Sequence, residues 1–164
     1  MTLTNIILVI TTTTVALIAG LLYAYSCSVN IGLGRLSDTE YVSAMQSINR
    51  AIQNPVFFIS FMGSLVFLPI STYLNYGQPI STRFWLLLAA TSTYLIGVFG
   101  ITIFGNVPLN NALEVFSLPS ASVKDIAVQR AKFEVPWNNF HLIRTVASIV
   151  ALILTIVACL KDNE

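Results

Sequence analysis

Four long apolar runs constrain this chain more than any other feature of its sequence. The runs lie at residues 5–26, 56–74, 84–104 and 142–160. Inside them Arg144, in the first turn of the last run, is the one lysine, arginine, aspartate or glutamate. A helix of about 20 apolar residues crosses the roughly 30 Å hydrocarbon core of a bilayer. The sequence therefore predicts an all-α, integral membrane four-helix bundle.

Composition agrees with this class, since 55% of the residues are hydrophobic and 9% are charged. No lysine or arginine precedes the first run, which is longer than the apolar part of a secretory signal, so we expect a retained helix. Four spans leave room for a single membrane domain over residues 1–164. The lipid bilayer is thus the first expected partner.

Charge and residue spacing argue against several function classes. The net charge is +1 without a Lys/Arg cluster, so no nucleic-acid partner is expected. One histidine, and two cysteines at positions 27 and 159, match no metal, haem or redox spacing. Phosphate-binding glycine loops and the GxSxG elbow of serine hydrolases are also missing. We therefore predict neither a metal nor a bound cofactor.

Two of the three connections are long enough to hold a short amphipathic helix. In the first, Ser37 and Glu40 have the spacing of a capping box, which predicts a helix from Asp38 to Gln53. Asn54 and Pro55 are typical of a helix start and open the second span.

In the third connection, Ser122 and Asp125 have the same spacing and predict a helix over residues 123–133, outside the membrane core.

The spans alternate in direction, so the end of the first and third must meet the start of the second and fourth. Polar residues gather at that end and on the helix that follows the first span: Ser26, Gln46, Asn49, Arg50, Asn54, Asn106, Asn110, Asn111, His141, Arg144 and Thr145. Polar groups inside a membrane are costly unless they face a partner or a cavity. A pocket lined by amides, an imidazole and aromatic rings suits a flat, hydrophobic molecule with a few oxygens.

Structural roles for the same residues stay open. Arg144 is one turn into its span and can extend its side chain to the headgroups. His141, Arg144 and Thr145 nevertheless share one helix face, which such an extension does not require. Pro108 frees helix carbonyls, and Asn106 and Asn110 are placed to bond to them.

Four motifs stand in the order of a known family. "Y.YS" ends the first span, "AMQSINRAIQNP" precedes the second, "FGNVPLNNAL" follows the third, and "W...HLIRT" opens the fourth. Together they resemble the anthrone-oxygenase-like family of small four-helix membrane proteins. The resemblance covers most of the chain and carries over onto Gln46, Asn49, Arg50, Asn54, Asn106, Pro108, Asn110, Asn111, Trp137, Arg144 and Thr145. At one place the chain departs from the pattern, because Leu142 stands where histidine is usual.

The resemblance implies oxidation of an anthrone, or a related hydrophobic polycyclic phenol, with O2 as co-substrate and without a cofactor. His141 is then the expected base, and Arg144 and Arg50 are expected to stabilise the oxyanion. The expected substrate-binding residues are Tyr25, Gln46, Asn49, Asn54, Asn106, Asn110, Asn111 and Trp137.

A non-catalytic function remains open as the alternative to an oxygenase. A non-catalytic protein that binds a lipid or hydrophobic small molecule, or an accessory subunit, would use the same pocket. A channel is disfavoured, because polarity on one side gives no continuous path. The oligomeric state is not predicted. Lysine and arginine are more frequent in the two long connections than near the termini, so the polar end is expected to face the cytoplasm.

Overall fold

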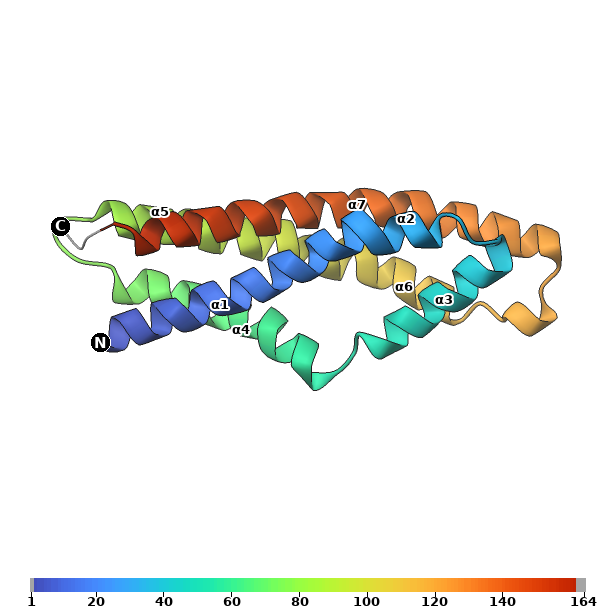
Figure 1. Ribbon diagram of the computed structural model, residues 1–164, viewed down its shortest axis with the longest axis horizontal. Helices are drawn as coiled ribbons and strands as arrows, with labels where there is room; N and C mark the ends of the chain where they lie inside the picture. Colours follow the sequence, from blue (N-terminus) through green and yellow to red (C-terminus); the bar gives the residue numbers. More distant parts are fainter. Residues whose placement is uncertain (1, 162–164) are drawn as a thin grey trace.

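The computed structural model describes residues 2–161, and these form a bundle of four long helical rods (Figure 1). In chain order the elements are α1 (Leu3–Ala24), η1 (Tyr25–Val29), α2 (Asn30–Leu33), α3 (Asp38–Ala51), α4 (Pro55–Leu74), α5 (Thr82–Thr93), η2 (Tyr94–Gly100), η3 (Thr102–Asn106), α6 (Val107–Glu114), η4 (Leu118–Ser120) and α7 (Val123–Cys159). The elements η1, η2 and η3 are π-helical, and η4 is a 3-10 turn.

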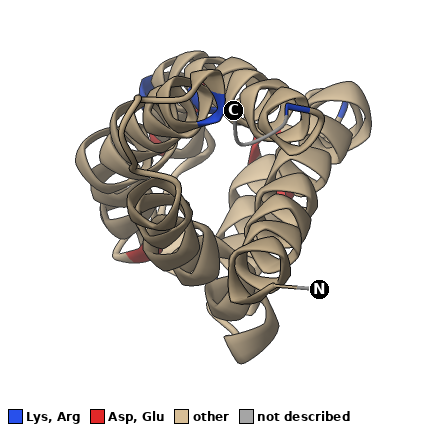
Figure 2. Ribbon diagram, turned by 90° about the vertical axis from the view of Figure 1, so that its left-hand side faces the viewer, with Lys and Arg blue, Asp and Glu red and all other residues tan. Residues whose placement is uncertain are grey.

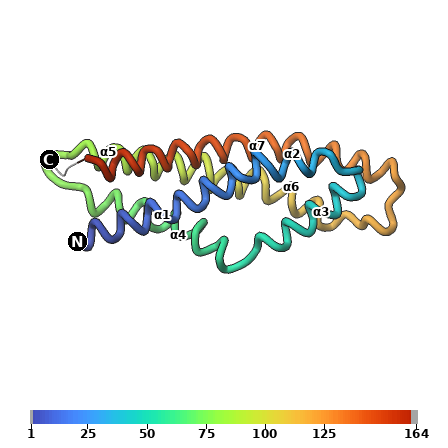
Figure 3. The backbone as a smooth tube through the Cα atoms, in the orientation of Figure 1, coloured from blue at the N-terminus to red at the C-terminus, as the bar shows by residue number. Residues whose placement is uncertain are grey.

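Four rods are long and apolar enough to cross a membrane, as predicted. They are Leu3–Leu33, Pro55–Leu74, Thr82–Glu114 and Val123–Cys159. Seen from one end, the rods surround a common axis (Figure 2). The start of α1, the end of α7 and the α4–α5 connection lie at one end of the bundle, and the α2–α3 and α6–α7 connections lie at the other (Figures 1 and 3). The polar residues of the sequence therefore do belong to one end, which we call the polar end.

The helix predicted over residues 123–133 begins where expected but does not end there. Ser122 Oγ accepts a hydrogen bond from the Asp125 amide at 3.2 Å and completes a capping box. The helix then continues through Pro136 to Cys159, so the fourth span and the short helix are one element. Its buried face is unbroken across the proline, and that packing outweighs the loss of one backbone hydrogen bond.

The other helix boundaries also shift. The helix predicted from Asp38 to Gln53 ends at Ala51, and Asn54 caps α4 by accepting from the Phe57 amide at 3.0 Å. The first and third spans run beyond the predicted ends because π-helical turns connect them to α2 and α6.

Arg130 on α7 fastens α3 at the polar end. Its guanidinium donates to the Leu36 carbonyl at 2.8 Å, to Asp38 at 3.1 Å and to Glu134 at 2.7 Å. The same group lies 4.4 Å from the centre of the Tyr41 ring. These contacts fix the start of α3 against α7.

The start of α3 at Ser37 is also fixed by hydrogen bonds within its own first turn. Ser37 and Glu40 form the predicted capping box, and hydrogen bonds from Ser37 hold the pKa of the Glu40 carboxyl below its usual range. The carboxylate therefore stays charged where the helix dipole favours it.

Apolar side chains from α1, α4, α5, η2 and α7 pack together in the middle of the bundle. Polar pairs join the helices nearer the termini, such as Thr11 with Ser71 at 2.6 Å and Thr72 with Thr91 at 2.8 Å. Such pairs are ordinary helix contacts in membranes.

Gly97 lies at a tight contact between the third and fourth rods. A Cβ atom there would lie 2.6 Å from the Cβ of Ala147, whereas nothing lies within 4 Å of the equivalent position at Gly20. We expect Gly97→Ala to lower the free energy of unfolding by about 1–3 kcal/mol through overpacking. Gly20→Ala, the matched control, should leave it unchanged or raise it by up to about 1 kcal/mol.

Thermal unfolding in one detergent measures both variants. Ala147→Gly added to Gly97→Ala makes room for the new methyl group and should restore stability. If the double variant is no more stable than Gly97→Ala, close packing at this contact is not the cause.

Candidate active site

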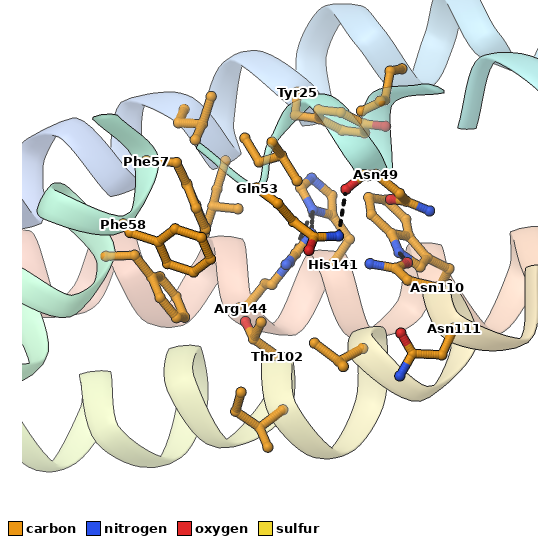
Figure 4. A pocket seen from close by; sticks show the side chains of 18 of the residues that line it. Tyr25, Asn49, Gln53, Phe57, Phe58, Thr102, Asn110, Asn111, His141 and Arg144 are labelled. Atoms are coloured by element: carbon orange, nitrogen blue, oxygen red, sulfur yellow. Dashed lines mark hydrogen bonds between the residues drawn. The ribbon is translucent and has the colours of Figure 1, made fainter. Parts of the chain in front are cut away.

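A cavity of about 270 Å³ lies at the polar end, between α1, α3, α4, the third rod and α7 (Figure 4). Its volume is near the lower end of the range for small-molecule sites. Seven of the sequence-predicted site residues line it: Tyr25, Asn49, Asn110, Asn111, Trp137, His141 and Arg144. Four separate stretches of the sequence therefore do converge on one cavity.

Most of the remaining wall is apolar, and sequence reasoning missed it. Phe57, Phe58, Phe61 and Met62 come from the first two turns of α4. Leu21, Leu22, Ile48, Ile52, Gln53, Thr102, Ile103 and Val107 complete the lining. The sequence did contain a signal for these four side chains. The helix α4 starts at the polar end, and residues spaced by three and four share a helix face.

His141 is buried and bonded at both ring nitrogens. On one side, Arg144 Nε and Nη2 lie 3.3 and 3.1 Å from Nδ1. On the other side, Nε2 lies 2.9 Å from Ser26 Oγ and 3.4 Å from Thr145 Oγ1. Arg144 lines the cavity, whereas Ser26 and Thr145 do not, so Nδ1 is the nitrogen on the cavity side.

Aromatic rings support this pair. Trp137 is stacked on His141 with centroids 5.1 Å apart and 10° between the planes. The Arg144 guanidinium carbon lies 5.1 Å from the centre of a Trp137 ring, and Tyr25 contacts both Trp137 and His141. Trp137 Nε1 donates to Asn110 Oδ1 at 2.7 Å. The indole thus orients the imidazole, the guanidinium and one amide together.

Asn49 on α3 has an unmet hydrogen bond. Its side chain is 7% exposed and lines the cavity, yet its Nδ2 atom has no hydrogen-bond partner. A buried N–H without an acceptor is unfavourable by about 1–3 kcal/mol. This donor is therefore available to an oxygen of a bound molecule.

Gln46 and Arg50, on the same helix, do not line the cavity. Gln46 Nε2 donates to the Leu113 and Phe116 carbonyls at 2.8 and 2.9 Å, which ties α3 to the end of α6. Arg50 forms a 2.7 Å ion pair with Glu114 at the surface. Both contacts hold α3 in place.

Asn54 and Asn106 also lie outside the cavity lining. Asn54 caps α4, and its Nδ2 donates to the Ala51 carbonyl at 2.8 Å. Asn106 is buried, and its Nδ2 donates to the Trp137 carbonyl at 3.2 Å. That bond joins η3 to α7 at the residue after Pro136.

Within residues 2–161, no three side chains among His, Cys, Asp and Glu are close enough together to hold a metal ion.

A family model described as anthrone oxygenase matches residues 56–154, which is more than half of the chain. The matched range holds α4, the third rod and most of α7, whereas Tyr25 and Asn49 lie before it. Comparison with curated proteins and with solved structures gave no match. The match over residues 56–154 and the four apolar rods show that the chain belongs to the anthrone oxygenase family.

Proposed function

We propose that this protein is a membrane-embedded oxygenase that uses O2 to oxidise a hydrophobic, anthrone-like polycyclic phenol. The observation that carries the proposal is a largely apolar cavity with one imidazole nitrogen and one guanidinium on its wall. Membership in the anthrone oxygenase family supports the same reaction class. A flat, aromatic substrate would be held between Phe57 and Phe58 of α4 and the aromatic wall around Trp137, which all line the cavity.

The reaction needs no redox group other than substrate and O2. A base removes a proton from the central methylene of the anthrone, and the resulting enolate passes one electron to O2. The carbon radical and superoxide then join, and the peroxide takes up a proton. Loss of water breaks the O–O bond and removes the second methylene hydrogen, which leaves the quinone carbonyl. One oxygen atom enters the product and the other leaves as water, so the reaction balances.

His141 Nδ1 is the proposed base, and Arg144 is the proposed oxyanion partner. In the structure Arg144 donates to Nδ1, so the lone pair of the base is covered. A substrate oxygen that attracts the guanidinium draws it away and uncovers Nδ1. The base is then available only when a substrate oxygen is in place.

The amides complete the proposed binding site. Asn49 Nδ2 supplies a donor without another partner, and Asn110 and Asn111 add polar groups from α6 (Figure 4). Polar atoms of the substrate would be held at these places while its rings occupy the apolar part.

One observation also supports a non-catalytic function. Because Nε and Nη2 of Arg144 both lie within hydrogen-bond distance of His141 Nδ1, the two side chains form a closed polar pair rather than an exposed base. A protein that only binds a hydrophobic molecule, or an accessory subunit, would bind the same ligand without consuming oxygen.

Oxygen uptake by the detergent-purified protein, given a hydroxyanthrone, decides between the two. We expect quinone formation above the spontaneous rate, with kcat lowered about 100-fold or more in His141→Ala and in Arg144→Ala. Arg35→Ala, which changes an exposed arginine, is the control and should match the parent protein. An unaltered rate in His141→Ala removes the assigned base, and ligand binding without any catalysed uptake favours the binding function.

Substitution of Asn49 should affect ligand binding without lowering the unfolding temperature. Since its Nδ2 has no partner, Asn49→Ala should keep or raise the unfolding temperature while weakening hydroxyanthrone binding up to about tenfold. Gln46→Ala, on the same helix, should instead lower the unfolding temperature, because it removes two hydrogen bonds. Thermal unfolding and anaerobic quenching of tryptophan fluorescence measure the two effects. Equal destabilisation by both substitutions would contradict the role given to Asn49.

We also propose that the polar end faces the cytoplasm. Its connections hold Arg35, Arg50, Lys124, Arg130 and Lys132, against Arg83 and Lys161 at the other end. The start of α1 and the end of α7 then lie on the far side of the membrane (Figure 1). A reporter that works only outside the cytoplasm should be active when fused to the C-terminus, and activity of a cytoplasmic reporter there would reverse the orientation.

A further inference from the structure

Ser26 lies behind His141, on the side away from the cavity. Its Oγ is 2.9 Å from His141 Nε2 and 3.3 Å from Thr145 Oγ1. The hydroxyl also donates to the Leu22 carbonyl of its own helix at 3.1 Å. Since a hydroxyl has one hydrogen, the side of Ser26 that faces the imidazole is left with lone pairs.

The second hydroxyl beside Nε2, that of Thr145, also donates its hydrogen to a backbone carbonyl. Thr145 Oγ1 donates to the His141 carbonyl at 2.7 Å, one turn back along α7, and is left as an acceptor toward the ring. Nε2 is therefore surrounded by acceptors and must carry the proton to satisfy them. On the other side, Nδ1 receives Arg144 donors and must carry a lone pair.

The π-helical turn η1 explains how Ser26 reaches this position. It widens the first rod at Tyr25–Val29, and the adjacent residues Tyr25 and Ser26 both contact His141. Single π-helical turns often occur at functional sites.

We propose that Ser26 is a positioning residue, which holds His141 in the tautomer with the proton on Nε2 and the lone pair of Nδ1 toward the cavity. The proposal rests on the proposed function for its effect on turnover, but the tautomer is defined by the hydrogen bonds alone. Ser26 acts when Arg144 turns to the substrate oxygen, because the donors on Nδ1 then no longer fix the tautomer. Nδ1 stays unprotonated and takes the substrate proton, while Ser26 keeps its bond to Nε2–H of the imidazolium.

Nitrogen NMR tests the tautomer directly, because His141 is the only histidine in the chain. Protein labelled with ¹⁵N-histidine and purified through a tag without histidine gives one pair of ring-nitrogen signals, and the protonated nitrogen is identified from its coupling to hydrogen. At a pH where the ring is neutral, we expect the proton on Nε2. The same measurement in an Arg144→Ala background isolates Ser26. There Ser26→Ala should produce a measurable Nδ1–H form, and Ser26→Thr should suppress it.

Ser148→Ala is the matched control. Ser148 lies one turn beyond Thr145 on the same face of α7, is fully buried and donates to the Thr145 carbonyl at 2.8 Å, without contacting the imidazole. Its spectrum should equal that of the protein with serine at both positions. If the substitutions only loosened the packing between the helices, Ser26→Ala and Ser148→Ala would change the ring-nitrogen spectrum alike.

Turnover of the hydroxyanthrone is measured with Arg144 present. Ser26→Ala should lower kcat about tenfold or more with KM changed less than twofold, and Ser26→Thr should restore it. A proton on Nδ1 in the parent protein, or a tautomer unchanged by Ser26→Ala, overturns the proposal. If the tautomers are as expected but the parent protein shows no turnover, the proposed function fails while the assignment of Ser26 stands.

Discussion

A cation inside a membrane-spanning helix has to be solvated by the protein itself, and this constraint organises the polar end of the bundle. Arg144 donates to His141 and lies against Trp137. Each partner is bonded onward, the imidazole to Ser26 and the indole to Asn110. The contacts reach from α7 to the first rod and to α6, so one charge sets the mutual positions of three rods.

The fold was largely predictable because its main signals are local or depend on length. Apolar runs near 20 residues long predict the rods, and their alternating directions predict which ends meet. The capping boxes at Ser37 and Ser122 mark helix starts correctly. The end of a helix depends on what packs beside it, and for this reason Pro136 was a misleading signal. Ile126, Phe133 and Trp137 keep one buried face across the proline, and no local rule contains that contact.

The candidate site was predictable in part for the same reason. Polar residues at the polar end could be collected from the sequence, but an amide that binds a ligand and one that binds a carbonyl are the same residue type. Gln46 and Asn106 hold backbone carbonyls, whereas Asn49 retains an unpaired donor. The role of Ser26 depends on its contacts with both the Leu22 carbonyl and His141 Nε2, and only the three-dimensional fold brings these groups together.

The length of α7 has a further consequence for a molecule that arrives through the lipid. Its 37 residues span about 55 Å, whereas the hydrocarbon core is about 30 Å thick, so a large part of the helix extends beyond that core. His141 lies near the middle of α7, and the apolar run 142–160 begins at the next residue. We therefore expect the imidazole near the level where acyl chains meet headgroups. An amphiphilic aromatic molecule dissolved in the bilayer orients at this level by itself, with its hydroxyl-bearing edge toward water. The membrane would then perform the first alignment of the substrate before any side chain touches it.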